Sequence, residues 1–308
     1  MNKVSVIIPT YKRSEYLSRA IESILNQTYE ILEIIVIDDN HPDSQDRLET
    51  KKRMKKYNEN DKVIYHQNKF NLGGALARNE GIKIATGEFV TFLDDDDYYE
   101  VNKIESQIKY MLINNLDLSF TNIKIFNENN KMVDYRDHKY VKSLHNKDLL
   151  KYHLLHHLTP TNTYMFKTSS LKKIGGFDDA IMGQEFHLML KSINSGLKIG
   201  YLPTDYVVQI LHSKERISVG PNKINAEIEL YKLKKGYNEI FNSKEKRYLK
   251  FRHRAVLAIV HKRSRNYLEF IKYSLSAFLT SPWFFTKELL NRVKKPNLIS
   301  ANVNNEEV

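Results

Sequence analysis

The apolar residues of the first hundred positions follow two alternating patterns. Short continuous apolar runs rich in Val and Ile predict strands that are buried on both faces of a sheet. Between these runs, apolar residues such as Leu17, Ile21 and Ile24 recur at helical spacing and predict amphipathic helices. The predicted strands are 3–9, 32–39, 63–68 and 88–97, and the predicted helices are 14–25, 51–62 and 73–85. This order predicts an α/β fold with a mostly parallel, Rossmann-like sheet flanked by helices.

The next 120 residues mix the two patterns less regularly. The predicted helices are 101–114 and 184–195, and the predicted strands lie near 117–126, 161–167 and 206–212. From about residue 223 the pattern is helical, basic and aromatic, which indicates a C-terminal helical extension. We therefore expect one domain over 1–220, with halves 1–100 and 101–220, and a helical region over 221–308.

The composition of the 308 residues excludes some chemistry and separates the two regions by charge. No cysteine is present, which excludes disulfides, zinc–thiolate sites and thiol nucleophiles. Residues 1–220 carry 30 Lys and Arg against 29 Asp and Glu, whereas residues 221–308 carry 18 against 8. A basic tail predicts contact with a membrane surface, a polyphosphate or a nucleic acid. We discount nucleic acid because no known binding module for it accompanies the charge.

Two apolar stretches bear on the location of the protein. The N-terminal run before Pro9 is too short for the apolar core of a secretory signal. The stretch 267–285 is interrupted by two charged residues and by Pro282, so it does not predict a transmembrane helix. From these patterns we expect a cytoplasmic protein, either free or peripheral on the inner face of the cell membrane.

Four consecutive aspartates, Asp94–Asp97, end the fourth predicted strand. Neighbouring like charges repel, so either water or a bound cation must offset them. Carboxylates at positions i and i+2 suit Mg²⁺ or Mn²⁺, which would share its other ligands with substrate phosphates. Ligands of parallel sheets bind beyond the carboxyl ends of the strands, where the ends of the first two strands should join this run. We favour a metal over a solvated turn, although folds for magnesium-dependent phosphoryl transfer also place acids there.

A second candidate site is the glycine-rich segment 71–81, NLGGALARNEG. Gly73 and Gly74 permit close approach of a ligand to the backbone at a helix start, and Arg78 lies about one turn further on. An arginine there can pair with phosphate oxygens in a fork geometry. A tight turn with a surface arginine fits the same residues equally well. The segment is neither a Walker loop nor the dinucleotide-binding fingerprint.

Three stretches together resemble one known family. They are VSVIIPTYKRSEYLSRAIESILNQTYEILEIIVIDDN, NLGGALARNEGIKIATGEFVTFLDDDD and GGFDDAIMGQEFHLMLK, in this order. The chain is similar, over about residues 3–218, to the inverting family 2 glycosyltransferases of the GT-A fold that build bacterial cell-surface polysaccharides or teichoic acids. The resemblance implies that residues 1–100 bind a nucleotide-sugar donor, with UDP expected as the nucleotide, and that residues 101–220 bind the acceptor.

The resemblance also implies roles for individual residues. Asp94 and Asp96 match the Asp-x-Asp motif that holds Mn²⁺ or Mg²⁺, which would neutralise charge on the departing diphosphate. Glu185 matches the general base that deprotonates the acceptor hydroxyl, at a position where the family more often has aspartate. The alternative for Glu185 is a purely structural carboxylate in the first turn of a helix, where the helix dipole favours negative charge. The residues expected to bind the nucleotide sugar are Pro9, Tyr11, Arg13, Asp39 (to the base), Arg78 (to the base or diphosphate) and Asp95 (near the nucleoside).

The segment 210–218, ILHSKERIS, resembles the loop with which many family members end the catalytic region. His212 is expected to complete the metal shell or to bond a phosphate, with simple packing as the alternative. Arg216 and Ser218 are expected to clamp the diphosphate. For His187, two residues beyond the expected base, we favour a structural position over an acceptor contact.

The prediction is a glycosyltransferase that moves a sugar to a hydroxyl of a cell-surface polysaccharide, teichoic acid or lipid-linked glycan by metal-assisted single displacement. One rival is a sugar-phosphate nucleotidylyltransferase, but the segment PTYKRSEYL lacks its glycine-rich Arg-Lys signature. Another rival is a non-catalytic nucleotide-sugar or glycan-binding module. For the basic tail, a helix in the membrane interface and a helical hairpin packed on the catalytic domain or on a second subunit are equal alternatives.

Overall fold

The structure is a computed structural model that describes residues 2–180, 182–212 and 221–290. The chain divides into two compact units, of which the first carries the strands and the second is mainly helical. The first consists of Met1–His153, Leu158–Ala180 and Gln184–Leu211, and the second of Leu154–His157, Ile181–Gly183 and His212–Val308.

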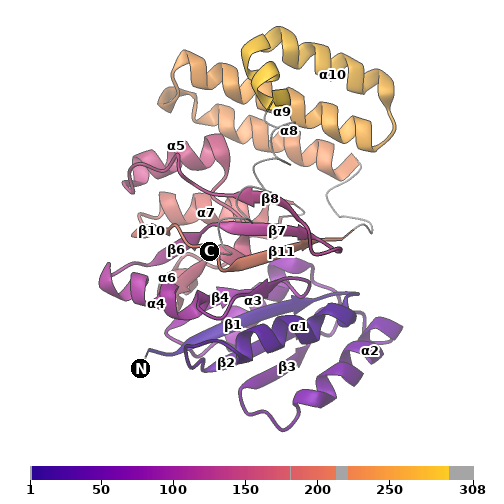
Figure 1. The fold of residues 1–308 in the computed structure, drawn as a ribbon, viewed down its shortest axis with the longest axis vertical. Helices are drawn as coiled ribbons and strands as arrows, with labels where there is room; N and C mark the ends of the chain where they lie inside the picture. Colours follow the sequence, from indigo (N-terminus) through magenta and orange to yellow (C-terminus); the bar gives the residue numbers. More distant parts are fainter. Residues whose placement is uncertain (1, 181, 213–220, 291–308) are drawn as a thin grey trace, which may run out of the picture. The chain divides into compact units, whose positions relative to one another are not determined.

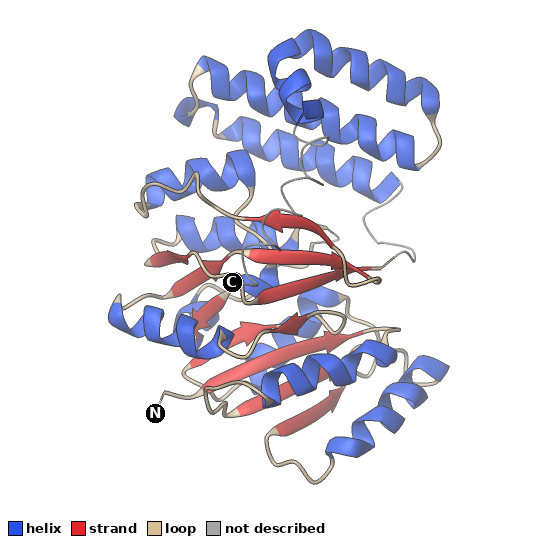
Figure 2. Ribbon diagram, viewed as in Figure 1, coloured by secondary structure: helices blue, strands red, loops and turns tan. Residues whose placement is uncertain are grey.

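A sheet forms the centre of the first unit (Figure 2). It has seven strands in the order β10-β6-β9-β4-β1-β2-β3. Its strands are β1 (Val4–Thr10), β2 (Glu33–Asp38), β3 (Val63–Gln67), β4 (Phe89–Phe92), β6 (Leu118–Thr121), β9 (Met165–Lys167) and β10 (Ile199–Leu202). β1 pairs in parallel with β2 and β4, and β2 pairs in parallel with β3. Only β9 runs antiparallel in this sheet of the described chain, between β4 and β6. The predicted mostly parallel sheet is confirmed.

Two hydrophobic clusters cover the two faces of this sheet. Val6 and Ile8 of β1 belong to one cluster and Ile7 to the other, because successive side chains of a strand point to opposite faces. The helices on the first face include α1 (Ser14–Leu25) and α4 (Lys103–Ile113), and those on the second include α3 (Gly74–Ile84) and α7 (Gln184–Asn194). Helices therefore flank the sheet on both sides (Figure 1), as the α/β prediction requires.

A smaller sheet of four strands has the order β5-β11-β7-β8. These strands are β5 (Tyr98–Tyr99), β7 (Ile123–Asn127), β8 (Met132–Arg136) and β11 (Val207–Leu211). β4 of the large sheet ends at Phe92 and β5 of the small sheet begins at Tyr98. The four aspartates therefore lie on the short connection between the two sheets.

The second unit contains α8 (Pro221–Gly236), η3 (Asn238–Ile240), α9 (Ser243–Arg263) and α10 (Tyr267–Thr280). α9 packs against both α8 and α10, and residues 282–290 form a further helical segment. The start of α9 is fixed by a capping box between Asn242 and Glu245. Among the described residues, the helices are all too short or too polar to span a bilayer.

Several elements differ from the predicted pattern. The predicted helix 51–62 is shifted, because α2 (Gln45–Met54) begins earlier and is followed by η1 (Lys55–Tyr57). The predicted strand 161–167 begins instead as η2 (Thr161–Thr163). The elements that were not predicted are β5, β8, β10, α5 (Asn146–His156) and α6 (Thr168–Lys173). These are short or only half-buried, so their apolar residues form no clear period.

Candidate active site

The ends of β1 and β2 and the acidic turn Asp94–Asp97 meet at one edge of the large sheet. β1 lies between β2 and β4. The backbone N–H of Asp39 donates to the carbonyl of Thr10 at 2.9 Å, which joins the segments that follow β1 and β2. Pro9 lies within β1, and Tyr11 is exposed just beyond it. The structure thus brings together residues far apart in the sequence.

Two arginines hold the acidic turn. Arg13 Nη1 donates to Asp96 Oδ2 at 2.5 Å and lies 3.8 Å from Asp95 Oδ1. Arg78 Nη2 donates to Asp94 Oδ1. Burial on its own would lower the pKa of Arg13, but the carboxylates of Asp96 and Asp95 outweigh it and raise that pKa. The repulsion among the aspartates is therefore offset in part by internal counter-charges.

The other carboxylates of the turn are buried. Burial, and next the carboxylate of Asp96, raise the pKa of Asp95 to about 8. Burial and then the neighbouring carboxylates raise the pKa of Asp97 well above its usual range. Asp97 accepts hydrogen bonds from Asn162 Nδ2 at 2.7 Å and from the backbone N–H of Ile210 at 2.9 Å. Asp97 is thus occupied in fixing the turn to β11.

The acidic turn offers oxygen ligands to a divalent cation. Asp95 Oδ2 is buried, and no described residue donates a hydrogen bond to it. Within the described chain, however, no three acidic or histidine side chains converge closely enough to hold a metal alone. Mg²⁺ in particular takes one or two protein carboxylates and completes its shell with water and substrate phosphates. The residues fit a cation that binds together with a diphosphate.

Asp39 holds the glycine-rich segment in place. Its Oδ1 accepts from Asn68 Nδ2 at 2.7 Å and from the N–H of Leu72 at 2.9 Å. Its Oδ2 accepts from Asn71 Nδ2 at 2.9 Å and from the N–H of Gly73 at 2.8 Å. Gly73 has a φ of +80°, which a residue with a side chain rarely adopts. Asp39 therefore shapes the entry to α3, and its predicted bond to the nucleoside base stays a prediction.

The substitution Asp39→Ala is expected to lower the free energy of unfolding by about 2–4 kcal/mol, because it leaves the buried amide of Asn68 and the partly buried N–H groups of Leu72 and Gly73 without an acceptor. Urea unfolding followed by circular dichroism measures this loss. The exposed Asp43 on the neighbouring loop provides the control, since Asp43→Ala should change stability by less than about 0.5 kcal/mol. An Asp39→Ala protein as stable as the control would show that these bonds contribute nothing net.

Arg78 connects the acidic turn to the start of α7. Besides its bond to Asp94, it donates through Nη1 to Gln184 Oε1 at 3.2 Å and to the carbonyl of Gly74 at 3.1 Å. Glu185 follows Gln184 in the first turn of α7 and is half-buried. A single side chain thus links the turn, the glycine-rich segment and the helix that carries the candidate base.

The rest of α7 anchors this helix to the first unit. Phe186 stacks on His153 with ring centroids 4.3 Å apart, and its carbonyl lies 2.9 Å from His153 Nε2. Burial is the main cause that raises the pKa of Tyr164, and the negative charge of Glu185 is the second. His187 is half-buried, with its ring 5.8 Å from that of Phe186. The structural position expected for His187 is compatible with this packing.

Comparison with known proteins identifies the family. The profile described as "Glycosyl transferase family 2" matches residues 5–175, more than half of the chain. The chain belongs to this family. It is 34% identical over 199 residues to "Uncharacterized glycosyltransferase MJ1057" of Methanocaldococcus jannaschii, which covers 63% of this chain and 66% of the relative. It is 36% identical over 126 residues to "UDP-Glc:alpha-D-GlcNAc-diphosphoundecaprenol beta-1,3-glucosyltransferase WfgD" of Escherichia coli, which covers 41% of this chain and 47% of the relative.

Solved structures agree with the GT-A fold of this family 2 chain. The crystal structure of S. aureus TarS 1-349 in complex with UDP-GlcNAc has a TM-score of 0.62, an identity of 18%, and covers 92% of this chain and 82% of that chain. At this identity the likeness shows the fold alone. The chain spans between 18% and 66% of the length of the first four curated relatives it matches.

The remaining predicted residues of this family 2 chain lie at or beyond the end of β11. His212 follows that strand directly and is half-buried. Arg216 and Ser218 lie outside the described residues. The expected phosphate and metal contacts of this segment therefore stay predictions.

Three residues near the turn were not singled out from the sequence. Gln184 bridges to Arg78, Asn162 binds Asp97, and Arg19 Nη2 donates to the backbone carbonyl of Asp96 at 2.5 Å. Gln184 directly precedes the candidate base, so its place in the motif could have indicated a role. The sequence around the other two carries no such signal.

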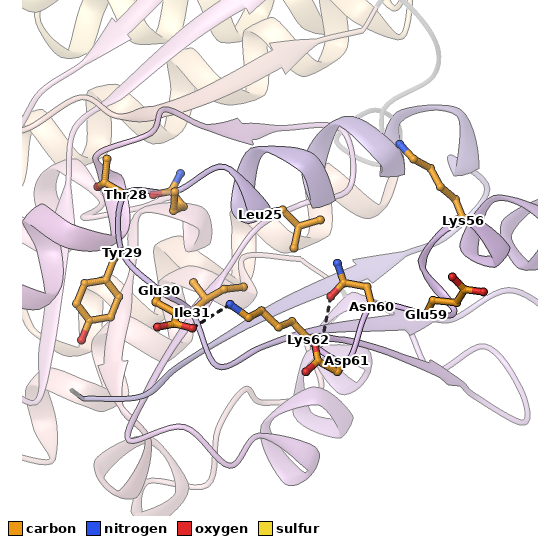
Figure 3. A pocket seen from close by; sticks show the side chains of 11 residues that line it. Leu25, Thr28, Tyr29, Glu30, Ile31, Lys56, Glu59, Asn60, Asp61 and Lys62 are labelled. Carbon is orange, nitrogen blue, oxygen red and sulfur yellow. Dashed lines mark hydrogen bonds and ion pairs between the residues drawn. The ribbon is translucent and has the colours of Figure 1, made fainter.

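A hollow of about 820 Å³ lies at the amino ends of β2 and β3 (Figure 3). Its lining comes from the segments 25–31 and 56–62, before these strands. Lys62 pairs there with Glu30 at 3.3 Å. The hollow is thus at the strand ends opposite to the acidic turn, and its charges are partly paired with each other.

Proposed function

We propose that this family 2 protein is an inverting glycosyltransferase that uses a UDP-linked sugar donor. The observation that supports the proposal is the link made by Arg78, which bonds both to Asp94 of the acidic turn and to Gln184, the residue directly before Glu185. WfgD is named for a UDP-Glc donor, and TarS 1-349 was crystallised with UDP-GlcNAc. Both names support UDP as the nucleotide.

The arginines are the donor-binding groups in this proposal. Arg13 and Arg78 are paired with carboxylates, and their guanidinium groups match a diphosphate equally well. Pro9 lies in β1 and Tyr11 is exposed just beyond that strand, at the same edge of the sheet. We propose that they contact the nucleoside, with Asp39 and Asp95 behind them.

Glu185 is the proposed catalytic base. It removes the proton from the acceptor hydroxyl, whose oxygen attacks the anomeric carbon of the sugar as the bond from that carbon to the diphosphate oxygen breaks. A single displacement of this kind inverts the anomeric centre. Glu185 lies in the first turn of a packed helix, which supports this role because the helix fixes the backbone from which the carboxylate projects.

The metal of the proposal is Mn²⁺ or Mg²⁺, held by Asp94 and Asp96. When bound, such a cation supplies charge neutralisation at the leaving diphosphate. Asp97 keeps the turn in place through Asn162 and β11. His212 is a further proposed ligand or phosphate contact, and Arg216 and Ser218 are proposed clamps.

The proposed acceptor is a hydroxyl of a cell-surface polysaccharide, a teichoic acid or a lipid-linked glycan, used at the inner face of the membrane. The name of WfgD, which includes a diphosphoundecaprenol acceptor, supports the lipid-linked class. The division into a catalytic domain over 1–220 and a helical region over 221–308 is also part of the proposal.

A thermal-shift screen of nucleotide sugars tests the donor. With Mn²⁺ present, a UDP-sugar at about a hundredfold its dissociation constant should raise the Tm by about 5–10 °C, because ligands stabilise the state that binds them. GDP- and CMP-sugars at equal concentration serve as controls. If a GDP- or CMP-sugar raised the Tm more than a UDP-sugar, the nucleotide of that sugar would replace UDP as the proposed donor nucleotide.

Hydrolysis of that donor, followed by released UDP, separates the enzyme from a non-catalytic binding module. We expect slow Mn²⁺-dependent release without acceptor. Binding without any hydrolysis or transfer would favour the binding module instead. Release of a sugar 1-phosphate in the presence of pyrophosphate would favour the nucleotidylyltransferase.

A further inference from the structure

The outer face of α10 is apolar although it is exposed. Leu268, Ile271, Leu275 and Leu279 lie at helical spacing on this face and are 57–83% exposed. We call these four residues the α10 stripe. Exposed aliphatic residues that occur singly are ordinary, but four on one helix face form a continuous patch, which marks an interaction surface.

The α10 stripe is not the packing face of the helix. Ala277, on the opposite side of α10, is fully buried. Arg254 of α9 donates to the carbonyl of Ser276 at 3.0 Å, and Tyr273 stacks on His261 of α9. α10 therefore packs on α9 through one side, as Figure 1 shows for these adjacent helices, and leaves the stripe uncovered within this unit.

The helical segment 282–290 also has one packed side and one exposed side. Phe284 packs against Phe251 of α9, and Phe285 packs against Phe278 of α10. On the other side, Trp283 is 69% exposed and shares a face with the exposed Lys287, four residues on. A tryptophan beside a lysine is typical of side chains that lie at the level of lipid headgroups.

Positive charge lies at the end of the stripe where α10 begins. Arg263 is the last residue of α9 and Arg265 lies in the turn that follows it, and both are exposed a few residues before Leu268. Residues 221–308 carry 18 basic against 8 acidic residues. Lys272 adds little, because it is paired with Glu269 at 3.0 Å. An apolar face bordered by cations complements the chemistry of an anionic bilayer surface.

We propose that the α10 stripe and Trp283 insert into the headgroup region of an anionic membrane, with Arg263, Arg265 and Lys287 on the phosphates. A second copy of this chain is the weaker occupant, because a two-fold symmetric contact would place two copies of the same positively charged surface against each other. This inference names the surface that reaches the membrane and rests on its own observations, independently of the transfer reaction.

Vesicle flotation of the full chain tests the proposal. Vesicles of phosphatidylcholine alone are compared with vesicles that also contain phosphatidylglycerol. We expect binding to the anionic vesicles that weakens with salt, and at least a tenfold lower partition for Leu275→Glu and for Leu279→Glu. The matched control is Ile113→Glu on α4, an aliphatic residue that is 83% exposed in the first unit and should leave the partition unchanged.

The charge is tested separately with Arg263→Gln combined with Arg265→Gln, which should lower the partition severalfold and reduce its salt dependence. Partition of the Leu275→Glu protein equal to that of the wild type would overturn the proposal. The proposal would also be overturned if the wild type bound no vesicles and light scattering showed a dimer that Leu275→Glu dissociates. Circular dichroism and a thermal melt of each variant show that it is folded, without use of any ligand of the proposed reaction.

Discussion

Replacement of Glu185 by glutamine is expected to lower the rate of sugar transfer by about 10²–10⁴-fold while donor binding stays within about twofold of the wild type. Glutamine has the same shape as glutamate, but it cannot accept the proton of the acceptor hydroxyl. The proposal that Glu185 is the base rests on its place in the first turn of α7, beside the Gln184 that Arg78 binds. Transfer is measured with donor and acceptor, and donor binding by calorimetry with UDP.

Glu59→Gln makes the same chemical change at an exposed position and should leave both quantities unchanged. The two measurements distinguish a base from a binding residue, because loss of a donor contact would weaken UDP binding as well. Near-normal transfer by Glu185→Gln would rule out Glu185 as the base. If Glu185→Gln weakened UDP binding as much as it lowered transfer, Glu185 would be assigned to donor binding instead.

The substitutions Asp94→Asn and Asp96→Asn are expected to remove the effect of Mn²⁺ on UDP binding and to lower transfer by more than about a hundredfold. Each replaces a charged oxygen ligand with a neutral amide and also frees the arginine that the carboxylate holds. The measurement is the dissociation constant of UDP with Mn²⁺ and with a chelator. In the wild type the two values should differ by at least tenfold, and in the variants they should agree.

The exposed Asp61 provides a matched control, because Asp61→Asn makes the same change on the loop before β3. It should keep the full difference between the two dissociation constants. The metal assignment would be wrong if the wild type bound UDP equally well with Mn²⁺ and with the chelator. Tighter metal-free binding by either variant would instead show that the released arginine contacts the diphosphate.

The sequence predicts the parallel half of the fold well, because strands such as Val4–Thr10 and Glu33–Asp38 are buried on both faces and read as continuous apolar runs. It does not predict that β9 runs antiparallel between β4 and β6, since strand direction depends on how a long connection returns and not on local apolar order. β8 is short and half-buried, so its residues show no clean alternation.

For the candidate site, the motif blocks indicate which residues gather but not what each side chain bonds. The pairing of Arg13 with Asp96 joins residues 83 positions apart, and local sequence contains no sign of it. The four hydrogen bonds accepted by Asp39 likewise come from a segment some thirty residues away. Such contacts depend on the sheet order, which brings the ends of β1, β2 and β4 together.

The pairing of Arg13 and Arg78 with the acidic turn has a consequence for how a donor enters. Both guanidinium groups have anionic partners within the protein, so their positive charge is compensated. If these groups turn to phosphate while the aspartates turn to a cation, each ion exchanges one counter-ion for another. Binding would then be a partner exchange with little change in local net charge. Donor affinity should accordingly vary only weakly with ionic strength, unlike capture of an anion by long-range attraction.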